Sequence, residues 1–563
     1  MKENMEVVFG LLGGLAIFIF GMNMMSEGLQ KAAGEKMKYI LGILTKNPVI
    51  GVLAGALVTA VLQSSSATTV MVIGFVSAGL MGLPQAISVI LGANIGTTMT
   101  AQLIAFKISD YIWPLVFIGF VIFFFSKKEK TKNIGQTIFA FGLLFVGIET
   151  MSSVMKPLAE SPVFTDLLGR VTNVPILGVL LGTCMTLVVQ SSSATIAVLQ
   201  NFASQAGPDG VTSIIGLAGA IPILLGDNIG TTITALLASV GQSKNAKRTA
   251  VAHSVFNITG SFIFIWIIPW FAKFIQWISP KGPEVAVIAR QIANAHTTFN
   301  VVNTLLWLPF IWVLVKIVTW IIPGTDEKQT DESKPRYLDE KIFNQPVFAM
   351  HLACQEILRC ADAVKEMADQ VKQALLSHDT AAVEKAYTCA DQIQNLNQNI
   401  VKYLSTLLSE GYATENQSAE ATRLLYVTNY IGRIGARLRE LTDAARVKND
   451  QHYQLSDCAM QEMQDILNQI SDMMEQSSQA LQAGDPYAAG MVIAKSDSLY
   501  EKEHSFSKNH MQRLHKGECN PEYTNFYTVV MHNIERIGNE CTNIAQAVMD
   551  GAKISAAKPQ LEA

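Results

Sequence analysis

The sequence contains the block Gln-Ser-Ser-Ser twice, each time inside a stretch that is otherwise apolar. Side chains of this kind offer neutral oxygens that suit a hard cation such as sodium, and hydroxyl and amide hydrogens that can be donated to an oxyanion. A site built from them could therefore hold a cation and an anion together. The eight residues are Gln63, Ser64, Ser65, Ser66, Gln190, Ser191, Ser192 and Ser193.

The surroundings of the two blocks are duplicated as well. Residues 51–68 and 178–195 are identical at 12 of 18 positions with a constant offset of 127, and residues 86–101 are repeated as residues 220–235. Duplicated segments that are polar and interrupted predict a transporter whose substrate site lies between the repeats, near the middle of the membrane. The alternative is that Ser, Thr and Gly only allow membrane helices to pack closely.

Charge is almost absent from these stretches. Residues 47–106 contain no Asp, Glu, Lys or Arg, and residues 171–243 contain only Asp209 and Asp227. A phosphate dianion that entered this region would find no basic side chain within it, so a cation must accompany the anion. Co-bound sodium would supply the positive charge, and the sequence therefore predicts transport coupled to sodium.

Asp227 is the one charged residue of its segment, and its counterpart in the first repeat is Ala93. A carboxylate within the membrane is a functional candidate, either as a sodium ligand or as a charge that moves during the cycle. Asp227 also precedes Asn228 and Gly230 at an expected segment start, where a helix N-cap is the alternative. Both interpretations stay open from the sequence.

Two further related strings, residues 252–257 (AHSVFN) and 295–300 (AHTTFN), place a His and an Asn four residues apart on one helical face. They predict either side chains that line the pathway or imidazoles that form hydrogen bonds between helices.

The elements that must position these residues are membrane segments. Hydropathy predicts them near residues 7–29, 49–106, 111–126, 134–156, 174–240, 249–279 and 300–322. Gly, Pro, Ser and Asn interrupt the long tracts, which predicts broken or re-entrant helices. The N-terminal apolar stretch predicts an uncleaved first helix. Basic loops at residues 127–132 and 244–248 favour the cytoplasmic side of the inner membrane for those loops.

The second half of the chain has a different composition. After a polar linker at residues 324–345, apolar residues recur at helical spacing and charges recur every few positions, which predicts a soluble helical bundle. Six of the seven cysteines are scattered there without zinc-site spacing, which favours reduced thiols in the cytosol. A net charge of −4 without a basic tract argues against a nucleic-acid partner.

The paired QSSS blocks, each followed by a GxNIGTT segment, resemble the type II sodium/phosphate cotransporters over about residues 5–320. The resemblance implies an all-α, polytopic transport domain (residues 1–323) with inverted repeats at about 5–126 and 134–322. It implies sodium-coupled symport of inorganic phosphate, with both QSSS blocks contributing to the phosphate and sodium sites. It adds as supporting residues Asn94, Thr97, Thr98, Asn228, Thr231 and Thr232, beside Asp227.

Residues 533–545 (NIERIGNECTNIA) resemble the signature helix of the PhoU phosphate-uptake regulators, and a weaker copy lies 103 residues earlier. The resemblance implies a cytosolic domain at residues 346–563 built as two three-helix units, with a regulatory role and a possible signalling partner. A dimerisation or stability module is the alternative. PhoU carboxylates hold metal clusters, and here Asp497, Glu501 and Glu535 match only in part, so salt-bridged or solvated carboxylates are the alternative.

An enzyme is disfavoured, because no GxSxG, P-loop, dinucleotide or HExxH motif surrounds the serines. Two other functions stay open: a membrane-anchored phosphate sensor that transports nothing, and a symporter of another oxyanion.

Overall fold

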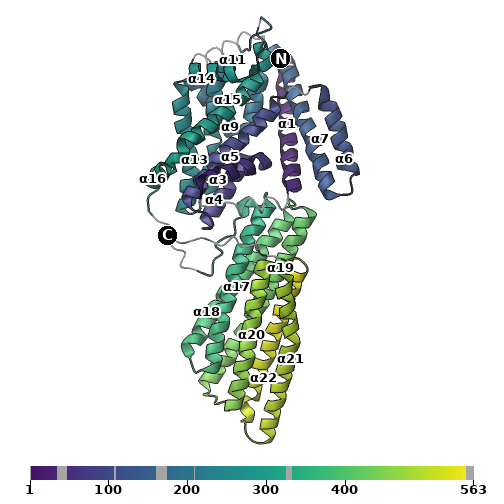
Figure 1. The fold of residues 1–563 in the computed structure, drawn as a ribbon, viewed down its shortest axis with the longest axis vertical. Helices are drawn as coiled ribbons and strands as arrows, with labels where there is room; N and C mark the ends of the chain where they lie inside the picture. The colour runs from purple at the N-terminus through teal and green to yellow at the C-terminus, as the bar shows by residue number, and fades with distance from the viewer. Residues whose placement is uncertain are drawn as a thin grey trace. The chain divides into compact units, whose positions relative to one another are not determined.

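The computed structural model describes residues 2–33, 47–106, 109–159, 174–207, 209–324, 332–552 and 554. The chain divides into two compact units, Met1–Asp326 and Glu327–Ala563 (Figure 1). Among the described residues the regular structure is helical, and a bridge between Ala206 and Ser213 is the β pairing. The prediction of an all-α chain is confirmed.

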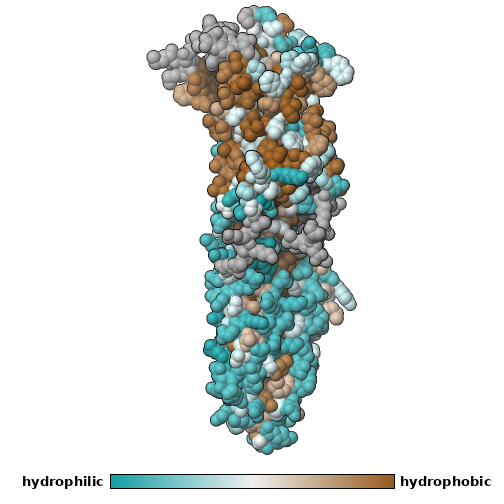
Figure 2. Space-filling view, turned by 90° about the vertical axis from the view of Figure 1, so that its left-hand side faces the viewer, coloured by the Kyte–Doolittle hydropathy of each residue, from teal (hydrophilic) through white to brown (hydrophobic). Residues whose placement is uncertain are grey.

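The first unit consists of apolar helices, and the face of it that Figure 2 shows carries many hydrophobic residues. Within the described residues, five helices are long and apolar enough to cross a membrane, and a sixth span arises if a pair bent by 92° counts as one. The chain is therefore a polytopic membrane protein, as predicted. Its helices are α1 (Lys2–Ala33), α3 (Pro48–Leu62), α4 (Ser65–Ser77), α5 (Leu83–Ile104), η1 (Ser109–Tyr111), α6 (Ile112–Phe125), α7 (Glu129–Ala159), α9 (Pro175–Val189), α10 (Ser192–Ala203), α11 (Gly216–Gly230), α12 (Thr232–Ser239), α13 (Lys244–Ile265), α14 (Ile268–Ile278), α15 (Glu284–Trp307), η2 (Leu308–Phe310) and α16 (Ile311–Ile321).

Broken helices occur where the sequence predicts them. Helices α3 and α9 have 15 residues each, or about 22 Å at 1.5 Å per residue, which is less than the roughly 30 Å of a hydrocarbon core. Each is followed directly by a second short helix, α4 or α10. The two helices of the bent pair are α13 and α14, which hydropathy predicted as a single membrane segment at residues 249–279.

Glycines let the short helices lie against their neighbours in the same way in both repeats. A Cβ on Gly92 of α5 would come within 1.9 Å of the Val52 carbonyl oxygen of α3, and one on Gly226 of α11 within 2.0 Å of the Val179 carbonyl oxygen of α9. Real Cβ atoms do not approach so closely. These glycines therefore allow the helices to pack closely, which is the alternative that the sequence offered for the small residues of the repeats.

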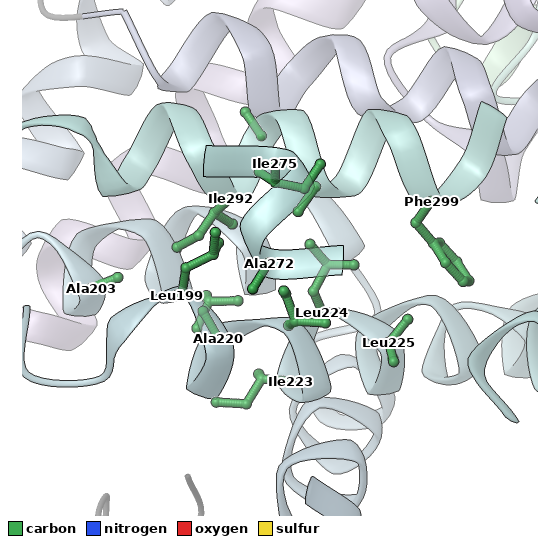
Figure 3. Packing of buried hydrophobic residues seen from close by; sticks show 14 of the residues in the cluster. Leu199, Ala203, Ala220, Ile223, Leu224, Leu225, Ala272, Ile275, Ile292 and Phe299 are labelled. Atoms are coloured by element: carbon green, nitrogen blue, oxygen red, sulfur yellow. The ribbon is translucent and has the colours of Figure 1, made fainter. Parts of the chain in front are cut away.

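The second repeat has a continuous apolar core that holds α10, α11, α14 and α15 together. Figure 3 shows Leu199 of α10, Leu224 of α11, Ile275 of α14 and Ile292 of α15 meeting in it, all of them buried. This packing fixes α15 against the helices that carry the second Gln-Ser-Ser-Ser block.

The second unit is a pair of three-helix bundles with a mainly hydrophilic surface (Figure 2). The prediction of two three-helix units is confirmed. The elements are η3 (Glu340–Ile342), α17 (Pro346–Leu376), α18 (Thr380–Ser409) and α19 (Glu415–Asp450), then α20 (Asp457–Ala483), α21 (Pro486–His515), η4 (Pro521–Tyr523) and α22 (Thr524–Met549).

Part of the predicted linker is attached to this unit. The fully buried carboxylate of Glu356 in α17 accepts hydrogen bonds from the main-chain N–H groups of Arg336 (2.8 Å) and Tyr337 (2.7 Å), and from Arg359. Residues 325–331 of the linker lie outside the described residues.

We expect Gly92→Ala to lower the free energy of unfolding by about 1–3 kcal/mol, because the added methyl group must displace α3. Gly13→Ala is the control, since a Cβ at Gly13 of α1 meets nothing within 4 Å. Thermal unfolding of the two purified variants in detergent measures the difference. Equal stabilities would contradict the packing argument.

Candidate transport site

Both Gln-Ser-Ser-Ser blocks form the same break in a helix. Gln63 ends α3 with φ 53° and ψ 22°, and Gln190 ends α9 with φ 55° and ψ 23°. This left-handed conformation costs a non-glycine residue about 1–2 kcal/mol, and such strain is often found at functional sites. The next residue then caps a new helix: Ser64 accepts from the N–H of Ala67, and Ser191 from that of Ala194.

Each break exposes the start of a helix at a polar block. The first N–H groups of α4 and α10 have no partner within their own helix, and they carry the partial positive charge of the helix N-terminus. Such ends bind oxyanions. Serine hydroxyls stand beside them, with Ser65 and Ser193 buried and Ser64, Ser66, Ser191 and Ser192 partly buried.

The two glutamines differ in their environment. Gln63 is only 7% exposed, its Oε1 accepts from Thr100 Oγ1 of α5 at 2.8 Å, and its Nε2 donates to the Ala60 carbonyl. Gln190 is exposed. Thr234, the counterpart of Thr100, donates instead to Ser66 Oγ at 3.0 Å and so joins the first block to the second repeat.

Asp227 is not a helix N-cap, so that interpretation is wrong. It lies near the C-terminal end of α11, which runs on to Gly230. The carboxylate is fully buried: Oδ1 accepts from Thr186 Oγ1 at 2.6 Å, and Oδ2 has no hydrogen-bond partner in the part of the chain that the structure describes. One carboxylate oxygen is thus left for a ligand.

Thr186 also contacts Thr195, with 3.1 Å between their hydroxyl oxygens, and the first repeat has the same contact between Thr59 and Thr68 at 2.9 Å. Sequence reasoning did not select these four threonines. They could have been found from the alignment of the two repeats, because threonine occupies the same positions beside each Gln-Ser-Ser-Ser block in both copies.

The Asn of each GxNIGTT segment contacts one of the two His/Asn strings. Asn94 Oδ1 lies 3.2 Å from His253 Nε2 and accepts from Asn257 at 3.4 Å, while Asn228 Oδ1 accepts from Asn300 at 3.2 Å. The predicted bond between helices is thus found for His253. His296, also buried, has no hydrogen-bond partner among the described residues.

Three of the supporting threonines donate to main-chain carbonyls three or four residues before them. Thr98 donates to the Ile95 carbonyl, Thr231 to the Asp227 carbonyl and Thr232 to the Ile229 carbonyl. Thr97 is buried with them. Their hydroxyl oxygens keep acceptor capacity after these bonds are made.

The structure adds a basic side chain that the local sequence does not contain. Arg290 of α15 donates from Nη1 to Gln102 Oε1 of α5 at 2.7 Å. Gln102 lies two residues after Thr100, so the guanidinium contacts the same C-terminal part of α5 that carries the partner of Gln63, on a different face of the helix. Residues 47–106 remain uncharged, but their surroundings are not.

The candidate metal carboxylates of the second unit do not form a metal centre. Asp497 and Glu501 are exposed, and Glu535 is partly buried with its Oε2 3.8 Å from His532 Nδ1. Among the described residues no three His, Cys, Asp or Glu side chains gather to hold a metal ion. The partly buried Glu462 instead pairs with Arg513. Burial raises the pKa of Glu462, but hydrogen bonds from Arg513, Asn509 and Tyr527 outweigh this and hold the pKa below its ordinary value.

The family model of the Na+/Pi-cotransporters matches the chain twice, at residues 17–153 and 145–277, and each match includes one of the Gln-Ser-Ser-Ser blocks. The PhoU domain model also matches twice, at residues 357–444 and 463–548. The chain belongs to the Na+/Pi-cotransporter family. Both QSSS breaks lie within the matched residues, and the second unit is a pair of PhoU domains.

Relatives of this Na+/Pi-cotransporter family member fall into three groups. YqeW of Bacillus subtilis, an uncharacterised protein, is 35% identical over 280 residues, which is 50% of this chain and 89% of YqeW. The putative inorganic phosphate export protein YjbB of Salmonella typhimurium is 23% identical over 97% of this chain and 98% of its own. Sodium-dependent phosphate transport protein 2A of Rattus norvegicus is 37% identical over 97 residues, 17% of this chain and 15% of that protein.

We expect Gln63→Ala to destabilise the protein by about 1 kcal/mol more than Gln190→Ala, because only the former leaves the buried hydroxyl of Thr100 without its acceptor. Unfolding midpoints of the two variants in the same detergent measure this. Equal losses would show that the difference in burial has no energetic consequence.

Proposed function

We propose that this protein moves inorganic phosphate together with sodium across the cytoplasmic membrane. The observation that carries the proposal is the pair of matching helix breaks at Gln63 and Gln190, each of which presents a helix N-terminus and a row of serine hydroxyls. These groups are neutral donors and acceptors, so they can hold an oxyanion and a cation without a permanent charge of their own.

Phosphate would be bound by the first-turn N–H groups of α4 and α10 and by the serine hydroxyls beside them. The contact between Ser66 and Thr234 supports a site shared by the two repeats, because it brings α12 against the first block. The name of protein 2A supports phosphate and sodium as the transported species, although the match covers only a small part of that protein.

Sodium would be bound by neutral oxygens of the same blocks, with Asp227 as the one acidic candidate. Its free Oδ2 and the neighbouring hydroxyls of Thr186 and Thr195 supply oxygens of the kind that sodium prefers. The sodium and phosphate gradients together set the direction of transport. YjbB is named for phosphate export. We therefore propose that the protein always couples phosphate to sodium, and that the two gradients decide whether phosphate enters or leaves the cell.

We further propose that the PhoU pair lies on the cytoplasmic side and regulates transport. Two PhoU matches in one chain support a regulatory unit.

Proteoliposomes that contain the purified protein should take up radiolabelled phosphate under an inward sodium gradient and not under an equal choline gradient. Asp227→Asn should raise the sodium concentration for half-maximal uptake about tenfold, because the ion loses a charged ligand. Asp209→Asn is the matched control: this exposed carboxylate lies in the same uncharged stretch but accepts hydrogen bonds from Thr212 in a loop. Sodium-independent uptake would overturn the coupling.

Deletion of residues 336–563 should leave transport in proteoliposomes but remove the response of transport to the phosphate status of the cell. Uptake by cells grown in high and low phosphate, divided by the amount of protein in the membrane, measures that response. A change in protein amount alone would identify the PhoU pair as a stability module instead.

A further inference from the structure

The guanidinium of Arg290 is held at a meeting point of helices that carry the transport site. Besides the bond to Gln102 Oε1 at 2.7 Å, Nη1 donates to the Gln102 main-chain carbonyl at 3.2 Å, and the group lies over the ring of Phe106, 4.4 Å from its centroid. Thr100, two residues before Gln102, donates to Gln63. Thr100 and Gln102 point to different faces of α5, so the C-terminal part of this one helix contacts the first Gln-Ser-Ser-Ser block on one face and Arg290 on another.

The second block reaches the same place through α10. Gln200 of α10 donates from Nε2 to the Ala101 carbonyl of α5 at 3.1 Å and to the Ala289 carbonyl of α15 at 2.9 Å. Ala101 and Ala289 are the neighbours of Gln102 and Arg290 in the sequence. Helices α5, α10 and α15 thus meet beside the Arg290 side chain.

A polar stripe continues from Arg290 along α15. Asn294 and Thr297 follow at spacings of four and three residues, which places all three on one face of the helix. Gln102 Nε2 donates to Asn294 Oδ1 at 3.2 Å and to Thr297 Oγ1 at 3.0 Å. The three α15 residues are partly exposed, and the stripe is about 10 Å long at 1.5 Å per residue.

We propose that Arg290 attracts phosphate to the transport site: its guanidinium draws the oxyanion to this stripe, beside the C-terminal part of α5 that also carries Thr100, the partner of Gln63. The inference rests on the proposed transport of phosphate. A charged side chain inside a membrane segment is costly unless it lines a polar path, and a guanidinium binds phosphate oxygens through two parallel hydrogen bonds. The Gln-Ser-Ser-Ser blocks themselves are neutral, so a cation beside them attracts the anion without placing a permanent positive charge where it is bound.

A purely structural role makes a different prediction. Arg290 donates to the main-chain carbonyl of Gln102 in the last turn of α5, where basic side chains stabilise helix C-termini. If that were its whole role, its removal would change stability and leave the phosphate dependence of transport as it was. The KM for phosphate and its dependence on ionic strength therefore distinguish a role in attracting phosphate from a purely structural role.

The experiment is sodium-driven phosphate uptake by the full-length protein in proteoliposomes, at low and high ionic strength. We expect Arg290→Gln to raise the KM for phosphate about tenfold with a maximal rate within about twofold of the original, and Arg290→Lys to recover most of the loss. The KM of the unmodified protein should rise with ionic strength, since salt screens the attraction, and that of Arg290→Gln should not.

Lys316→Gln is the matched control, because Lys316 of α16 is a single positive charge that stacks on Trp312, 4.8 Å from the ring centroid, away from the stripe. Its KM should be unchanged. If Arg290→Gln does not fold, the isosteric variant Thr297→Val keeps the arginine and removes an acceptor from the stripe, and its KM for phosphate should rise about threefold.

An unchanged KM in the folded Arg290→Gln protein, or in Thr297→Val where the former does not fold, would overturn the inference and leave Arg290 as a helix cap. Failure of the unmodified protein to transport phosphate would instead overturn the proposed function, and the inference with it.

Discussion

The transport unit depends on two helix breaks in a part of the chain that is surrounded by apolar residues. Main-chain N–H and C=O groups that lack partners are costly in a hydrocarbon environment, so a helix can stop there only if protein or water satisfies its ends. The breaks at Gln63 and Gln190 meet this demand with a left-handed residue followed by a serine cap. The groups that remain unpaired at each new helix start are the ones that can bind an ion.

Close packing keeps each break in place. The helices before the breaks lie against α5 and α11 at distances that only glycine allows, and the contacts are equivalent in the two repeats, Gly92 to Val52 and Gly226 to Val179. These glycines allow the helices to pack closely, and the close packing in turn holds the polar turns in place. Packing and function are therefore compatible roles for the small residues. Short, closely packed helices hold the polar turns at a fixed depth.

The repeats agree in backbone and differ in chemistry. Thr59 and Thr186 each contact a second threonine, but only Thr186 also has a carboxylate beside it, because Ala93 occupies the position of Asp227 in the first repeat. Gln63 is buried and bonded where Gln190 is exposed. Duplication thus provides two similar polar turns, and a few substitutions make them unequal, which fits the proposed binding of two different ions.

Composition and repetition alone determined the class of this protein. Long uncharged apolar stretches are typical of membrane segments, so the membrane-spanning helical half and the soluble half followed from the sequence. The polar block kept in both copies marked the eight Gln and Ser residues at which the helices break. The tertiary structure decided the partners, because hydrogen bonds between distant segments leave no local pattern. It placed Asp227 inside a helix against Thr186, and it brought Arg290 to Gln102 across 188 positions of the chain.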